Sequence, residues 1–72
     1  MFDFPRFLKT HWANDRALHR LLKQYGVAGV SAAAVYKWWI RESIPAEHMP
    51  VVLALLELER GGPVSLAEFL KT

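Results

Sequence analysis

The spacing of apolar residues along the chain predicts a series of short helices. The first helix is expected to follow Asp3, whose carboxylate can cap it, and to end near Ala13. Residues three and four positions apart share one side of a helix. The apolar side of this segment consists of Phe4, Phe7, Leu8, His11 and Trp12.

A second helix is expected to begin at a cap, either Asn14 or Asp15, and to end just before Gly26. Glycine is common one residue beyond a helix end because it tolerates positive φ. The inner side of this helix consists of Ala17, Leu18, Leu21, Leu22 and Tyr25. Residues 27–30 then form a tight connection to the next helix.

Ser31 is placed to cap a third helix, from Ala32 to about Arg41. Its buried side is expected to carry Val35, Trp38 and Trp39, which lie three and four residues apart. For Trp39 two places remain open, under the following helix or at a dimer contact. The opposite side of the helix carries Ala32, Ala33, Tyr36 and Lys37.

The segment Ile44-Pro45 predicts a turn into a fourth helix. A proline inside a helix removes a hydrogen bond, so Pro50 predicts either a kink or a short 3₁₀ turn before a main helix from about Pro50 to Glu59. Apolar residues cover most sides of that helix, so we expect it to be buried on most sides.

Gly61-Gly62-Pro63 interrupts the chain, and the capping-box spacing of Ser65 and Glu68 predicts a last helix from Leu66 to Lys71. No strand pattern and no repeat occurs. We therefore expect an all-α fold of five short helices in a single domain. The second and third helices form one unit over about 15–41, and the last two helices lie over about 45–71.

The composition favours a folded protein with surplus apolar surface. Of the 72 residues, 53% are hydrophobic, which is too many for a disordered segment and more than so small an interior hides easily. We take this as an indication of a homodimer formed through the last two helices. The residues expected at that interface are Leu53, Leu56, Val64, Leu66 and Phe69.

The sequence also excludes several kinds of site and of cellular location. The chain has no cysteine, which excludes disulfides and thiolate metal sites. Its longest apolar run, residues 51–56, is far shorter than the roughly 20 residues that span a bilayer. The first residues lack the basic and apolar regions of a signal peptide. We expect a soluble, intracellular protein that is not associated with membranes.

Charge is distributed unevenly along the chain. Residues 1–41 contain seven basic and two acidic residues, a net charge of +5, whereas residues 42–72 contain two basic and five acidic residues, a net charge of −3. Such a division indicates that one face meets a polyanion.

A basic helix, a glycine-containing turn and a serine-capped short helix together predict a helix-turn-helix unit. Small residues in the first turn let a helix approach base edges in the major groove, and Ala32, Ala33 and Ala34 meet this requirement. Tyr36 and Lys37 are long enough to reach bases or phosphates. The basic residues expected near DNA phosphates are Arg16, Arg20, Lys23 and Arg41.

The segment from Gly29 to Trp39 (Gly-Val-Ser-Ala-Ala-Ala-Val-Tyr-Lys-Trp-Trp), followed by Ile44-Pro45-Ala46-Glu47, resembles the recognition segment of Cro-type phage repressors and the related YdaS-like helix-turn-helix proteins. The likeness covers roughly residues 15–58. It implies a phage or prophage repressor that binds an operator as a homodimer, in the bacterial cytoplasm and associated with the nucleoid.

In that resemblance base contacts fall to Ala32, Ala33, Tyr36 and Lys37, and Ser31 lies near a phosphate. The family usually has a small residue four positions before the turn glycine. With Gly26 as that glycine the position is Leu22 and the turn is about three residues longer than usual; with Gly29 it is Tyr25. We favour the first assignment.

Two other functional classes were weighed. An enzyme is not expected, because His11, His19 and His48 are scattered and no carboxylate or histidine pair has metal-ligand spacing. No cofactor or small-molecule substrate is expected either. The main alternative is a helical protein-interaction module that has a helix-turn-helix fold but does not use it on DNA.

Overall fold

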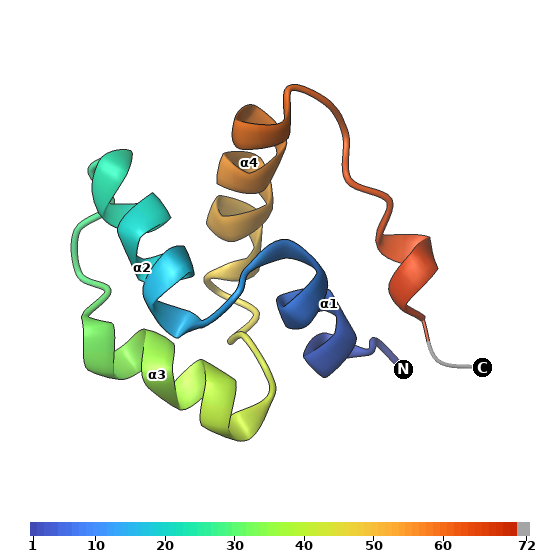
Figure 1. Cartoon of the computed structure of the whole chain (residues 1–72), viewed down its shortest axis with the longest axis horizontal. Coiled ribbons are helices and arrows are strands. Elements are labelled where there is room, and N and C mark those ends of the chain that lie inside the picture. The colour runs from blue at the N-terminus through green and yellow to red at the C-terminus, as the bar shows by residue number, and fades with distance from the viewer. Residues whose placement is uncertain (71–72) are drawn as a thin grey trace.

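The chain forms four α-helices and one turn of 3₁₀ helix (Figure 1). The computed structural model describes residues 1–70. The elements are α1 (Phe4–His11), α2 (Asp15–Gln24), α3 (Ala32–Arg41), α4 (Met49–Arg60) and η1 (Leu66–Phe69). Over the described residues there is no β-strand, and one isolated antiparallel bridge joins Phe2 to Leu70. The all-α prediction is confirmed, but the number of helices was overestimated by one.

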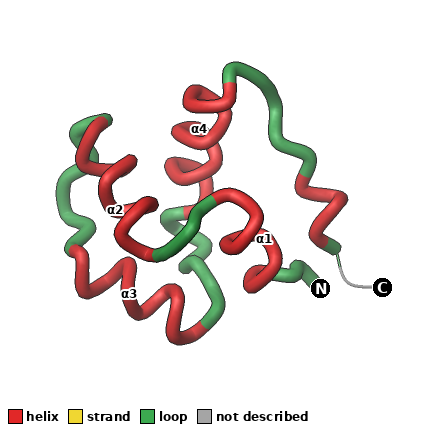
Figure 2. The backbone as a smooth tube through the Cα atoms, viewed as in Figure 1, coloured by secondary structure: helices red, strands yellow, loops and turns green. Residues whose placement is uncertain are grey.

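Helices α2 and α3 pack closely on each other, and α4 stands against α2 (Figure 1). Figure 2 shows a long loop that leads from the end of α4 back to α1, where η1 packs. The beginning and the end of the described chain therefore lie together, on the side of the molecule away from the α2–α3 connection.

Three of the predicted helix caps are present. The side-chain oxygens of Asp3, Asn14 and Ser31 each accept a hydrogen bond from the amide three residues later, at 3.3, 3.0 and 3.1 Å. Of the two candidates for the second helix, Asn14 is the cap. The first helix ends at His11 and not near Ala13, because Trp12 adopts an extended backbone and turns into the core.

The entry into α4 matches the predicted short turn. The amides of His48 and Met49 bond to carbonyls three residues earlier, at 2.9 and 3.3 Å, and Pro50 then lies in the first helical turn, where its missing N–H has no intrahelical partner to lose. The expectation that this helix is buried on most sides was wrong: Val51 and Leu58 are 43% and 64% exposed.

The core is made of side chains from every helix. Its buried members are Phe7, Leu8, Trp12, Leu18, Leu21, Leu22, Val35, Trp38, Ile44, Val52, Leu55, Leu56 and Phe69. Tyr25, predicted on the inner side of α2, lies outside this set. Its hydroxyl instead donates to Glu59 Oε2 at 3.1 Å, and this hydrogen bond raises the pKa of Tyr25.

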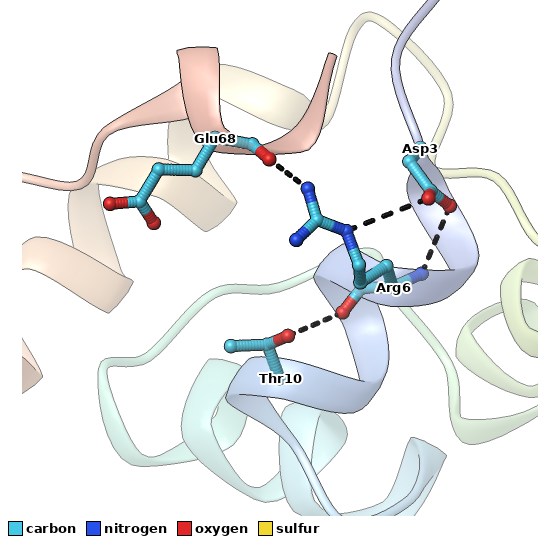
Figure 3. A network of polar contacts seen from close by, with 4 residues as sticks. All are labelled: Asp3, Arg6, Thr10 and Glu68. Atoms are coloured by element: carbon cyan, nitrogen blue, oxygen red, sulfur yellow. Dashed lines mark hydrogen bonds and ion pairs between the residues drawn. The ribbon is translucent and has the colours of Figure 1, made fainter. Parts of the chain in front are cut away.

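The predicted last helix, from Leu66 to Lys71, is replaced by the 3₁₀ turn η1, and Lys71 lies outside the described residues. The side chain of Ser65 makes no capping bond. The chain leaves the helical conformation at Leu70, whose backbone is extended (φ −79°, ψ 131°) and pairs with Phe2. The carbonyls of the last turn bond to other parts of the chain: the Arg6 guanidinium donates to the Glu68 carbonyl (Figure 3), and the Asp3 amide donates to that of Phe69. An isolated segment this short also cannot sustain an α-helix.

The Arg6 side chain makes several contacts that hold this C-terminal turn against α1. Besides its bond to Glu68, its guanidinium lies 4.8 Å from the centre of the Phe69 ring and 3.6 Å from the Asp3 carboxylate. Thr10 bonds back to the Arg6 carbonyl at 2.7 Å (Figure 3). Phe69 is thereby held in the core, 3% exposed, against Phe7.

The residue that directly follows α3 has a strained backbone conformation. Glu42 has φ +55°, the left-handed region, and its amide bonds to the Trp39 carbonyl while that of Ser43 bonds to Trp38. Glycine normally occupies this position of a helix end, because a Cβ there is close to the neighbouring carbonyl.

Replacing Glu42 by glycine is expected to stabilise the protein by about 0.5–1 kcal/mol, since relief of the left-handed strain exceeds the entropy gained by the unfolded chain. Urea unfolding monitored by tryptophan fluorescence measures this change. Glu42→Ala is the matched control, because it removes the same carboxylate but keeps the Cβ. An equal gain in the alanine variant would show that charge, and not backbone strain, is the cause.

His11 sits among aromatic rings beneath η1. Its ring centre lies 5.0 Å from that of Phe7 and 5.7 Å from that of Phe69, and its Nε2 is buried without a hydrogen-bond partner within residues 1–70. Burial, with a smaller effect from the Arg60 charge, lowers the pKa of His11 below the ordinary 6.5, and Glu68 opposes this in part.

The protein is expected to lose stability as the pH falls below about 6.5, because the unfolded chain takes up the His11 proton before the folded one does. The stabilisation is fully present above that pH and declines toward the lowered pKa. Urea unfolding between pH 7.5 and 5 measures the slope. His11→Gln should flatten it, whereas His19→Gln should leave it as in the wild type; an unchanged slope in the first variant would contradict the assignment.

Candidate nucleic-acid interface

Helix α3 is fixed to the body of the protein by one side only. Val35 is fully buried and Trp38 is 5% exposed, and the Trp38 ring lies 5.2 Å from that of His48. Trp39 is half-buried and packs edge-on against Trp12 at 6.4 Å, at the end of α1, and its place at a dimer contact stays a prediction. The helix is thus held in a defined orientation with its other side free.

The free side of α3 carries all four of the predicted base-contact residues. Ala32, Ala33, Tyr36 and Lys37 are exposed, Tyr36 by 54%. Sequence reasoning missed Ile40, which is 63% exposed although it is large and apolar. The signal was available, since Ile40 follows Ala33 by seven residues, two helical turns, and therefore lies on the same face.

Ser31 is exposed at the start of this face. Its hydroxyl oxygen accepts the cap bond from the Ala34 amide at 3.1 Å. A hydroxyl that accepts a hydrogen bond still has its own hydrogen to donate, so the same group can cap the helix and contact an acceptor outside.

Arg41, a predicted phosphate contact, lies on α3 close to Lys37, a predicted base contact. Lys37 and Arg41, one turn apart on α3, line a hollow of about 300 Å³ with Ser43 and Pro45. Within residues 1–70 neither cation forms an ion pair. Two like charges one helical turn apart repel each other, which makes this hollow a favourable place for an anion.

The three basic residues of α2 share one side of that helix, because Arg20 and Lys23 follow Arg16 by four and seven residues. Arg16 and Lys23 are exposed to solvent. Arg20 lines a separate hollow of about 240 Å³ with His11 of α1 and Glu59 of α4, away from α3. The contacts of Arg16, Arg20 and Lys23 with DNA phosphates stay a prediction.

The α2–α3 connection extends from Tyr25 to Ser31. Gly26, at φ +72°, ends α2: its amide bonds to the Lys23 carbonyl and the next amide bonds to that of Leu22, both at 3.0 Å. Gly29 also has positive φ, +83°. The assignment of Gly26 as the glycine that ends α2, followed by a lengthened connection, agrees with this geometry.

The predicted dimer residues do not form one exposed surface. Leu56 and Phe69 belong to the core of the single chain, at 5% and 3% exposure, so they were wrongly assigned to an interface. Leu53 and Val64 are half-buried and pack against that core, and only Leu66, at 37%, is exposed. The larger exposed apolar side chains of α4 are instead Val51 and Leu58.

Other kinds of site were sought in the described residues. Residues 1–70 contain no group of three or more histidine or acidic side chains placed to hold a metal ion. None of the helices in this part of the chain has the length and apolar character needed to cross a membrane.

No family model, no curated protein and no solved structure matches this chain.

Loss of the Ser31 cap is expected to lower the free energy of unfolding by about 1 kcal/mol, which for a domain this small shifts the melting temperature by about 4–8 °C. Thermal unfolding of Ser31→Ala measures this. Ser31→Asn is the matched control, because its side-chain oxygen can replace the cap. Equal losses of stability in both variants would show that the Ser31 hydroxyl does not stabilise the protein as a helix cap.

Proposed function

We propose that the protein is a sequence-specific double-stranded DNA-binding protein whose helix α3 enters the major groove. The observation that carries this proposal is the contrast between the two sides of α3. On one side of the helix Val35 and Trp38 are buried in the core, and on the other side Ala33 and Lys37 are exposed to solvent.

Steric requirements of the major groove support this choice. The groove admits one helix, and base edges come within reach only where the leading turn carries small side chains. Ala32 and Ala33 are the exposed residues of that turn. Tyr36 and Lys37, one turn later, have the length to reach bases across a wider gap.

Electrostatics supports the same orientation. Each phosphate neutralised by lysine or arginine releases condensed counterions, and this release supplies much of the affinity for DNA. Lys37 and Arg41 border the α3 hollow, and Ser31 adds a hydroxyl donor at the other end of the helix. The acidic residues lie outside α3: residues 42–70, which follow it in the chain, contain five exposed carboxylates.

The biological role we propose is that of a transcriptional repressor of phage or prophage origin, as the resemblance of residues 29–47 to Cro-type proteins suggests. Such a protein represses by occupying a promoter and needs no cofactor. As a two-fold dimer it would bind two half-sites about one helical turn of DNA apart. Val51 and Leu58 provide exposed apolar surface for such pairing.

A binding selection from random duplex DNA, performed at low and at physiological salt, tests the proposal. The wild type is expected to enrich a palindromic motif. Lys37→Ala is expected to weaken binding to that motif by about 1–3 kcal/mol and to blur one position, since a lost base contact costs discrimination. Arg60→Ala is the matched control: it removes an exposed cation at the far end of α4 (Figure 1) and should keep the motif.

Salt-sensitive binding without an enriched motif would contradict the proposal, because phosphate contacts alone produce it. It would favour a helical protein-interaction module. If Lys37→Ala selects an equally sharp motif, the DNA-binding function stands but Lys37 does not contact the bases.

A further inference from the structure

The exposed face of α3 is unusually poor in hydrogen-bonding groups. Between Ala32 and Ile40 the only polar side chains are those of Tyr36 and Lys37. The rest of the outward face consists of methyl and methylene groups, those of Ala32, Ala33 and Ile40. No amide, carboxylate or guanidinium side chain is present until Arg41 ends the helix.

This composition limits which bases α3 can identify. Adenine is normally recognised by an amide side chain that pairs with N6 and N7, and cytosine by an acceptor for its N4 hydrogens. Residues 32–40 contain neither an asparagine or glutamine nor a carboxylate, and the Tyr36 hydroxyl is the one acceptor among their outward side chains. A lysine can donate to guanine O6 or N7, and an apolar side chain can contact the methyl group of thymine.

We propose that α3 identifies thymines by their 5-methyl groups, chiefly through Ala33 and Ile40, with guanine contacted by Lys37 between them. The proposal rests on the DNA-binding function proposed above and names the feature of the base that is recognised. It predicts a half-site in which thymines flank a guanine on the contacted strands.

The order of the outward side chains along α3 supports this arrangement. Ala33, Tyr36, Lys37 and Ile40 follow one another at helical spacing on the face opposite Val35 and Trp38. The shortest of them stands in the leading turn, where the backbone approaches the bases most closely. The longer side chains of Tyr36 and Lys37 follow one turn later, and the branched apolar side chain of Ile40 lies one further turn along the same face.

Two separate thymines are needed to satisfy this face. Ala33 and Ile40 are seven residues apart, and at 1.5 Å per residue their positions differ by roughly 10 Å along the helix axis. One methyl group cannot touch both. The exposed 63% of Ile40 is the apolar surface that a thymine methyl would cover.

Replacing thymine by uracil removes the methyl group and keeps every hydrogen-bonding atom. In the duplex selected by the wild type, each thymine is replaced singly, and the dissociation constant is measured by fluorescence anisotropy at fixed salt. At the contacted thymines we expect uracil to weaken binding about fourfold, the loss that corresponds to burying one methylene-sized group. Thymines outside the motif serve as controls.

A variant cycle assigns each methyl to its side chain. Ala33→Gly should reduce the thymine-to-uracil affinity ratio at one position from about four to about one, and Ile40→Ala should do so at another. Because the readout is a ratio for one protein on two DNAs, it is insensitive to any loss of stability in the variant. Ile40→Val, which keeps the branched apolar surface, should retain most of the ratio.

The outcomes separate this inference from the function on which it rests. A selected motif whose affinity is unaffected by uracil at every position would overturn methyl recognition and leave DNA binding intact. Uracil effects that persist unchanged in Ala33→Gly and Ile40→Ala would overturn the assignment to α3. If no motif is selected, both the function and the inference are wrong.

Discussion

The orientation of α3 depends on the burial of two of its side chains, Val35 and Trp38. A ten-residue helix with three alanines in its first turn has too few interactions of its own to be stable in water. Burial of these two side chains, each at or below 5% exposure, supplies that stability through packing on the rest of the core. Because both lie on one side, the same contacts that hold the helix also decide which residues face outward.

A separate set of contacts secures the two ends of the described chain. The Arg6 side chain stacks on Phe69 and donates to the carbonyl before it, and the aromatic residues of α1 surround that ring. A chain of this size buries only a modest fraction of its surface. Aromatic side chains bury a large area for each residue ordered, which compensates for the short length.

Features governed by neighbouring residues were accessible from the sequence. The caps at Asp3, Asn14 and Ser31 and the glycine that ends α2 follow from local hydrogen bonding and backbone sterics, and the structure contains all of them. The outward positions on α3 also followed, because helical periodicity alone separates them from Val35 and Trp38.

Features that depend on distant residues were not accessible. Tyr25 has the correct phase for the core of α2, but its hydroxyl meets Glu59 at the end of α4. Leu66–Phe69 has a helical pattern, yet the chain leaves the helical conformation at Leu70, which has an extended backbone and pairs with Phe2. The placement of Arg20 beside Glu59 likewise depends on how α4 approaches α2. Periodicity indicates which side of a helix is apolar, but not which polar groups of other helices lie at the edge of that side.

The bridge between Phe2 and Leu70 has a consequence for the connectivity of the fold. The two ends of the described chain are neighbours, whereas α4 and η1 are joined by the exposed loop of residues 61–65 (Figure 2). The covalent order of the helices is therefore not dictated by their packing. A circularly permuted chain, opened in that loop and closed between the present ends, would retain the same core and the same free side of α3.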